Sequence, residues 1–153
     1  MLVVSDVYTL PDLLARAVNK FPDSDIVVFP ESRTTYKELY ERASKAACSL
    51  KSMGIGSGDS VGILMSNCLE FVDLLIGSQL IGAVPVPINA RYKAKELAYV
   101  IDDAELKRLV WWTSHMMGEE ELHKKLKLVK EVRDANPDGP YKKILREEHG
   151  MVI

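Results

Sequence analysis

Apolar and polar residues alternate in five blocks along the middle of this chain. Three short apolar runs, at Ser60–Met65, Val84–Ile88 and Lys107–Trp112, are separated by two segments with helical periodicity, residues 67–82 and 94–104. Apolar runs of this length predict buried strands, and helix-length connections predict parallel pairing with right-handed crossovers. The pattern therefore predicts an α/β fold with three layers and a mainly parallel sheet, built on a βαβαβ core.

The residues before this core predict a helix and a hairpin. Apolar residues recur at three- and four-residue steps from Leu10 to Phe21, and Thr9 is in position to cap that helix. Ile26–Phe29 and Arg33–Tyr36 flank a Pro-Glu-Ser turn, which predicts two antiparallel strands.

A second helix is predicted to begin at a capping box. Thr35 and Glu38 have the required spacing, and Gly54 is a natural left-handed stop. The residues predicted to face inward are Leu39, Ala43, Ala46, Ala47, Leu50 and Met53. Because three of them are alanines, we expect this helix to approach the sheet closely.

The segment 67–82 is apolar nearly all round, which predicts a buried helix. Asn67 and Glu70 repeat the capping-box spacing at its start. In the apolar run that follows, Pro85 and Pro87 cannot donate ladder hydrogen bonds. That run is therefore expected either at an edge of the sheet or as a strand of only a few paired residues.

The chain changes character after Trp112, so we divide it into an α/β part, residues 1–112, and a charged helical segment, residues 113–153. Gly118–Glu148 carries dense charge. Its narrow apolar stripe of Leu122, Leu126, Val129 and Val132 predicts an amphipathic surface helix ending before the turn signal at residues 136–140. The residues after that turn are compatible with a short helix or a frayed tail.

Composition describes an ordinary soluble chain. With 153 residues it forms one domain or part of a larger one, and its net charge of −2 gives no reason to bind nucleic acid. Cys48 and Cys68 lie in helical segments without metal-binding spacing, which predicts buried, reduced thiols and a cytoplasmic location. The start lacks the features of a signal peptide, and charged residues and prolines in Leu69–Ile88 argue against a membrane span.

The sequence offers little that could perform chemistry. His115, His123 and His149 have no metal-ligand spacing, and we expect His123 on a solvent-exposed helix face. The glycine-rich segment 54–59 precedes a strand, whereas a phosphate-binding loop follows one, so it is expected to be a turn. Trp111 and Trp112 are expected to serve packing. We therefore assign no catalytic, cofactor-binding or metal-binding residue.

Several short motifs, in order and at matching spacing, resemble the adenylate-forming acyl-CoA synthetases, over residues 8–112. The motifs are Thr34–Leu39 (TTYKEL), Leu50–Ile63 (LKSMGIGSGDSVGI), Asn67–Phe71 (NCLEF), Ile81–Asn89 (IGAVPVPIN), Asn89–Arg91 (NAR) and Lys95–Leu97 (KEL). In this family such motifs belong to the N-terminal portion of the fold. Lys93 departs from the pattern because the family often has a capping Ser or Thr there, so the helix start at residue 94 is expected to be weaker.

The resemblance implies an enzyme that joins a carboxylate to coenzyme A through an acyl-adenylate, using ATP and Mg²⁺. The family's Ser/Thr/Gly-rich phosphate loop, adenine-binding motif, ribose-binding Asp and catalytic Lys have no counterpart in these residues. We therefore expect an N-terminal segment of an acyl-CoA synthetase, acting in fatty acid metabolism and inactive alone.

The expected partner of such a segment is the remainder of a synthetase or a second copy of the chain. A competing hypothesis is a non-catalytic binding or scaffold protein that uses the same half-fold. A third is a small enzyme of another kind, since fold alone does not determine function.

Overall fold

A computed structural model describes residues 9–111, 123–128 and 131. Its helices and strands, in chain order, are α1 (Leu10–Lys20), β1 (Asp25–Phe29), β2 (Ser32–Thr35), α2 (Tyr36–Ser52), β3 (Ser60–Leu64), α3 (Leu69–Leu80), β4 (Val84–Ile88), α4 (Ala94–Asp103) and β5 (Leu106–Trp111). Residues 123–128 are also helical. Every element predicted between residues 9 and 111 is therefore present.

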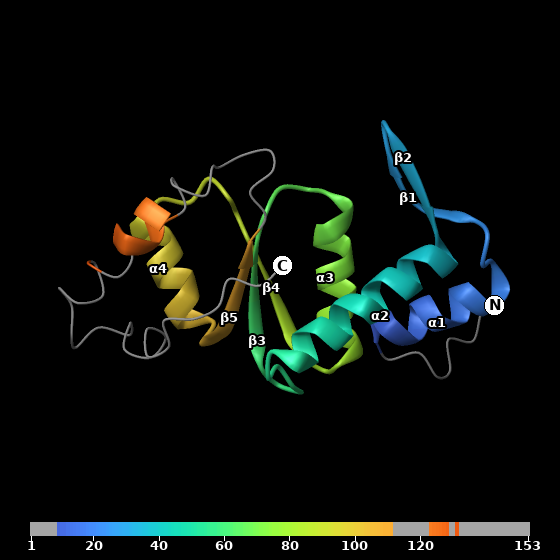
Figure 1. Ribbon diagram of the computed structural model, residues 1–153, viewed down its shortest axis with the longest axis horizontal. Coiled ribbons are helices and arrows are strands. Elements are labelled where there is room, and N and C mark those ends of the chain that lie inside the picture. The colour runs from blue at the N-terminus through green and yellow to red at the C-terminus, as the bar shows by residue number, and fades with distance from the viewer. Residues whose placement is uncertain (1–8, 112–122, 129–130, 132–153) are drawn as a thin grey trace, which may run out of the picture.

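Three parallel strands form the main sheet, in the order β4-β3-β5. Figure 1 shows α4 on one side of this sheet and α2 and α3 on the other. The antiparallel pair β1–β2 forms a separate hairpin beyond α2. The predicted three-layer α/β fold with a βαβαβ core is confirmed.

Each face of the sheet carries its own apolar core. On the α4 side the buried residues are Leu64, Ile88, Leu97, Ala98, Ile101 and Leu106. On the α3 side they are Leu50, Ile55, Val61, Ile63, Met65, Ala83 and Val110. A third cluster, Leu14, Leu39, Ala43 and Ile76, joins α1, α2 and α3. Four of the twelve residues of α3 are buried and the others are partly exposed, so the helix is largely covered and the prediction of a buried helix is met in part.

The capping box of α2 forms as predicted. The Thr35 backbone N–H donates to Glu38 Oε2 over 2.8 Å, and the Glu38 N–H donates to Thr35 Oγ1 over 3.2 Å. The hydrogen bonds that the Glu38 carboxylate accepts, first from the Thr35 backbone N–H and second from the Thr35 hydroxyl, lower the pKa of Glu38. Thr9 caps α1 by accepting from the Asp12 N–H over 3.2 Å. Gly54 ends the α2 region with φ of 79°.

The alanines of α2 correct one expectation. They lie against α3 and not against the sheet: a Cβ added to Gly77 would be 2.8 Å from the Ala43 carbonyl oxygen and 2.9 Å from Ala46 Cβ. Two helices can approach this closely only where small residues face each other, so the alanines serve helix–helix packing.

Two further expectations are wrong in detail. Cys68, not Asn67, is the N-cap of α3, and no side-chain hydrogen bond caps that helix. Cys48 is exposed and Cys68 only partly buried, because Cys48 lies on the outer face of α2. At α4 the expected weak start is found, since Lys93 makes no side-chain cap. Its backbone N–H is nevertheless satisfied by Glu96 Oε2 at 2.8 Å.

The charged segment is described only in part. His123 is exposed, as predicted, and Leu126 packs against the apolar core beneath α4. The rest of the predicted helix 118–148, His115, His149, Trp112 and the Trp111 side chain lie outside the described residues, as does the proposed boundary at residue 112. Among the helices that the structure describes, none combines the length and apolarity needed to cross a membrane.

Candidate functional site

The connections of the sheet single out one position for a binding site. The chain leaves β3 for α3 on one face, and leaves β4 for α4 on the opposite face. The carboxyl ends of β3 and β4 are therefore a topological switch point, where the two following loops diverge. Open α/β sheets bind ligands in the crevice that forms at such points.

A crevice of about 350 Å³ lies at this switch point. Its lining comes from the β3–α3 loop, the first turn of α3, the end of β4 and the β4–α4 loop: Met65, Ser66, Asn67, Phe71, Pro87, Ile88, Asn89, Ala90 and Arg91. Apolar side chains alternate with a hydroxyl, two amides and one guanidinium. Such a mixture suits a small organic molecule with an anionic or polar end.

The β4–α4 loop owes its shape to Asn89. Asn89 Oδ1 accepts the Arg91 backbone N–H over 2.9 Å, and the Asn89 carbonyl accepts the Tyr92 N–H over 3.0 Å. This local turn sets the backbone of Arg91, whose side chain is exposed and carries the single charge in the crevice lining that the structure describes.

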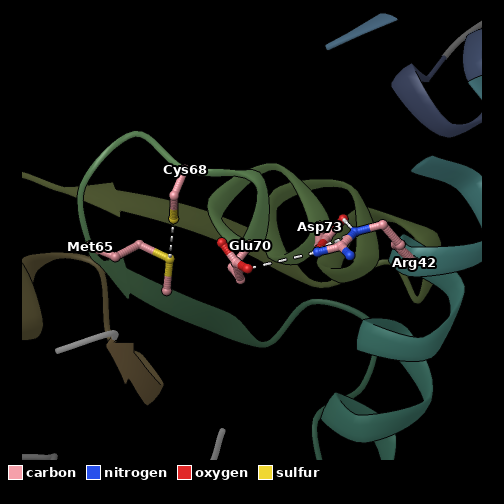
Figure 2. A network of polar contacts seen from close by, with 5 residues as sticks. All are labelled: Arg42, Met65, Cys68, Glu70 and Asp73. Atoms are coloured by element: carbon pink, nitrogen blue, oxygen red, sulfur yellow. Dashed lines mark hydrogen bonds and ion pairs between the residues drawn. The ribbon is translucent and has the colours of Figure 1, made fainter. Parts of the chain in front are cut away.

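Behind the crevice, an ion-pair network fixes α3. Figure 2 shows Arg42 of α2 reaching toward Asp73 and Glu70 of α3. Arg42 Nη2 donates to Asp73 Oδ2 over 2.6 Å, Arg42 Nε donates to Asp73 Oδ1 over 3.1 Å, and Glu70 Oε1 lies 3.9 Å from Arg42 Nη2. This bidentate contact joins residues 31 positions apart.

The pKa shifts of Arg42 and Asp73 fit a structural ion pair and not an acid–base catalyst. Burial raises the pKa of the Asp73 carboxyl, and the Arg42 guanidinium offsets part of that rise. The hydrogen bond to Asp73 in turn raises the pKa of Arg42. Because the carboxylate is occupied by its partner, its role is to hold the start of α3, and with it the β3–α3 loop, against α2.

The same loop is closed by a sulfur contact. The Cys68 thiol lies 4.0 Å from Met65 Sδ, as Figure 2 shows. Burial raises the pKa of the Cys68 thiol, so at neutral pH it is protonated and a poor nucleophile. Cys68 therefore packs the loop.

A second, basic groove adjoins the crevice. It measures about 660 Å³ and is lined by Lys93, Ala94, Lys95, Glu96, Lys124, Lys125 and Leu128. Lys125 Nζ donates to the Ala90 carbonyl oxygen over 3.2 Å, which links this groove to the β4–α4 loop. Four lysines against one glutamate give it a positive charge suited to anions.

At the opposite end of the sheet, the glycine-rich loop before β3 has its amides bonded within the protein. In the loop before β3, the Gly56 N–H donates to Asp59 Oδ2 over 2.7 Å and the Gly58 N–H to the Gly82 carbonyl over 2.9 Å. These amides are committed to protein acceptors, so the prediction of a turn is confirmed. Asp59 also pairs with Lys107 Nζ at 2.7 Å, which lowers the pKa of Asp59.

Metal binding finds no support in the described part of the chain, where no three His, Cys, Asp or Glu residues group together. Sequence reasoning assigned no site residue, and it missed the crevice because its two loops are separated by α3. The only sequence signal for its location was the order of strands and helices, which places both loops at one end of the sheet.

Comparisons with known proteins agree with the motifs. The family model described as AMP-binding enzyme matches residues 14–149. A medium/long-chain-fatty-acid–CoA/3-oxocholest-4-en-26-oate–CoA ligase of Mycobacterium marinum is 33% identical over 101 residues, which cover 66% of this chain and 18% of that protein. A putative acyl-CoA synthetase of Bacillus subtilis, YngI, is 35% identical over 109 residues, covering 70% of this chain and 20% of YngI.

Solved structures give the same result. A fatty acyl CoA synthetase of Mycobacterium tuberculosis aligns with a TM-score of 0.66 and 27% identity, over 88% of this chain and 25% of that one. The N-terminal subdomain of NpsA from Klebsiella oxytoca aligns with a TM-score of 0.66 and 27% identity, over 71% of this chain and 28% of that one. The chain thus spans about a fifth of the length of these curated relatives. It belongs to the AMP-binding enzyme family, and its described residues have the fold of the N-terminal subdomain of adenylate-forming enzymes.

Proposed function

We propose that this chain provides the N-terminal portion of an AMP-forming acyl-CoA ligase, which converts a carboxylate, ATP and coenzyme A to an acyl-CoA. The match of the AMP-binding enzyme family to residues 14–149 carries this proposal. The crevice at the β3–β4 switch point supports it, because that is where a sheet of this kind binds small molecules.

The residues present define what this portion contributes. ATP with Mg²⁺ would supply the activation of the carboxylate, but no three acids group together in the described residues to hold the metal, and the Gly56 amide before β3 is already bound to Asp59. The lysines of the basic groove do fit the anionic groups of coenzyme A in charge. This portion therefore binds and orients, and the activation step depends on segments beyond it.

The proposal includes a cytoplasmic location. The free thiols Cys48 and Cys68 support it, because unpaired cysteines are typical of a reducing compartment.

The test is ATP–pyrophosphate exchange on the purified chain with short, medium, long and aromatic carboxylates. We expect no exchange above a heat-killed control from protein whose circular dichroism spectrum shows it to be folded. Clear exchange with any acid would contradict the proposal that this portion is inactive alone, since adenylation would then proceed without the segments on which it is said to depend.

A non-catalytic binding protein is the second candidate function. It is favoured by the large apolar side chains exposed on α1 and the hairpin: Leu10, Leu13, Phe21, Ile26 and Val28. The test is to mix this chain with a candidate partner. A stable complex that transfers no acyl group from any carboxylic acid would favour this alternative over the ligase proposal.

A further inference from the structure

Two sulfur atoms meet in the loop between β3 and α3. The Cys68 thiol lies 4.0 Å from the Met65 thioether, and Figure 2 shows the two side chains pointing toward each other. Met65 directly follows the last residue of β3, and Cys68 is the N-cap of α3. The strand and the helix on either side of the loop therefore fix the positions of both sulfurs.

A thioether beside a thiol is a pair of soft metal ligands. Sulfur ligands of this kind select Cu(I), whereas Mg²⁺, Ca²⁺ and Mn²⁺ are bound by oxygen. Ions that need three His, Cys, Asp or Glu ligands find no such group in the described part of the chain. Methionine belongs to none of these residue types, so neither that absence nor the spacing of His and Cys in the sequence bears on a thioether–thiol pair.

The separation of the two sulfurs suits one bridging ion. Metal–thiolate bonds are about 2.3 Å long, so sulfurs 4.0 Å apart can share an ion with a sulfur–metal–sulfur angle of about 120°. This is the angle of a three-coordinate ion, which leaves one position for water or another small ligand. The loop can therefore accept the ion without a large movement of its backbone.

One of the sulfurs is accessible and the other is buried. Cys68 is partly exposed, whereas Met65 is only 7% exposed. An ion therefore reaches the thiol first and then bonds to the thioether behind it. The thiol is protonated in the free protein because burial raises the pKa of Cys68. Binding replaces that proton, which passes to the solvent: Cys68–SH and M⁺ give Cys68–S–M and H⁺.

We propose that Met65 and Cys68 form a binding site for one soft monovalent metal ion, which in a cell is Cu(I). The site goes beyond the proposed function and does not rest on it, because neither sulfur has a part in that function. Met65 also lines the crevice at the switch point. The bound ion joins the end of β3 to the start of α3, so it holds one wall of that crevice in place.

Competition with bicinchoninate, a chromophoric Cu(I) chelator, measures binding under anaerobic, reducing conditions. The starting protein is Cys48→Ser, because Cys48 is an exposed thiol that binds Cu(I) by itself. Residues 115–117 (His-Met-Met) are also Cu(I) ligand types, so the site is defined as the equivalent that Cys68→Ser removes. We expect Cys68→Ser to remove one equivalent. Unchanged Cu(I) binding in this variant would overturn the proposal.

A matched pair of methionine variants tests the second ligand. Met65→Leu and Met53→Leu, each in the Cys48→Ser background, conserve side-chain volume in the same apolar cluster, and circular dichroism establishes that both fold. Met53 lies before β3, at the opposite end of that strand from Met65.

We expect Met65→Leu to weaken the Cys68-dependent equivalent by at least about tenfold, as changes around metal sites commonly do, and Met53→Leu to leave it unchanged. Equal affinities in the two variants would overturn the proposal, because the metal would then be an adventitious ion only, held by a single thiol.

Two further measurements read the site without relying on the affinity of a variant. X-ray absorption at the copper edge, on Cys48→Ser protein loaded with one equivalent, should show two sulfur neighbours at about 2.3 Å. A single sulfur neighbour would exclude Met65 as a ligand. Cu(I) should also raise the thermal unfolding midpoint of Cys48→Ser more than that of its Met65→Leu variant, because an ion that bridges the folded pair stabilises the folded state. Equal shifts would contradict the bridge.

Discussion

Both helical layers of this molecule lie on the sheet through apolar clusters, but only one of them is also fixed by contacts between helices. On one side, α4 lies on the sheet through a cluster that includes its own Leu97, Ala98 and Ile101. On the other, α3 is additionally fixed to α2, by the close contact at Gly77 and by the Arg42–Asp73 pair. Apolar burial tolerates small shifts, whereas a bidentate ion pair and a glycine contact fix position. The crevice therefore has one loop, β3–α3, held by α2, and another, β4–α4, held by its own turn.

Truncating the apolar layer should give the largest effect. Leu97 is completely buried, so Leu97→Ala removes its contacts beneath α4 and leaves a cavity. We expect a loss of about 3 kcal/mol in the free energy of unfolding, measured by urea denaturation. Tyr99→Ala on the exposed face of the same helix is the control, with an expected change of about 0.5 kcal/mol or less.

Replacing the glycine contact should come next. Gly77→Ala places a methyl group 2.8 Å from the Ala43 carbonyl, and we expect a loss of about 2 kcal/mol by urea denaturation. The direction of the change in stability is the test, because replacing glycine by alanine in a helix without such a contact stabilises the protein by about 0.5–1 kcal/mol. A stabilised variant would mean that α2 and α3 can move apart without cost.

Breaking the ion pair should have a similar or smaller effect. Arg42→Ala leaves Asp73 in a buried position without its guanidinium, and we expect a loss of about 1–2 kcal/mol, discounted because the Arg42 side chain is 40% exposed. The folded-state pKa of Asp73 is already raised by burial and should rise further in the variant. A group with a raised folded pKa stabilises below its unfolded pKa and loses that contribution as pH rises through the folded value.

The difference in free energy of unfolding between the parent protein and Arg42→Ala should therefore grow as pH rises above about 4. The double variant Arg42→Leu, Asp73→Leu removes both charges and should recover part of the loss. A deficit that is constant between acid and neutral pH would argue against a buried carboxylate as its cause.

The capping box should give the smallest effect. Thr35→Ala removes the side-chain cap of α2, with an expected cost of about 1 kcal/mol. The pKa of Glu38, measured by NMR titration, should lie below its ordinary value of 4.5 and move upward in the variant. Because a lowered folded pKa stabilises above the unfolded pKa, the contribution of Glu38 is lost as pH falls through the folded value. An unchanged titration would contradict the role of Thr35.

Local patterns were enough to predict the elements. Thr35 with Glu38 marked the start of α2, and the alternation of valines and prolines placed β4 at an edge, because each signal is complete within a few residues. Contacts between distant segments were not predictable. The alanines of α2 indicate close packing but not the partner, which is Gly77, and nothing local distinguishes Asp73 from a surface acid.

The crevice is intermediate in how far it could be predicted from the sequence. Its residues carry no catalytic motif, and only the divergence of the chain after β3 and β4 identifies them as neighbours. A topology read from the sequence could have located it, whereas its lining required the structure.

The prolines of β4 also bear on how the protein is made. During synthesis β3 and β4 leave the ribosome before β5, and a two-stranded sheet with open edges is prone to pair with other chains. Pro85 and Pro87 close the β4 side of that intermediate from the moment it forms. Only the β3 side then awaits a strand, and the next one to emerge after α4 is β5 itself. The placement of the two prolines thus leaves the β3 side as the edge to which β5 can add.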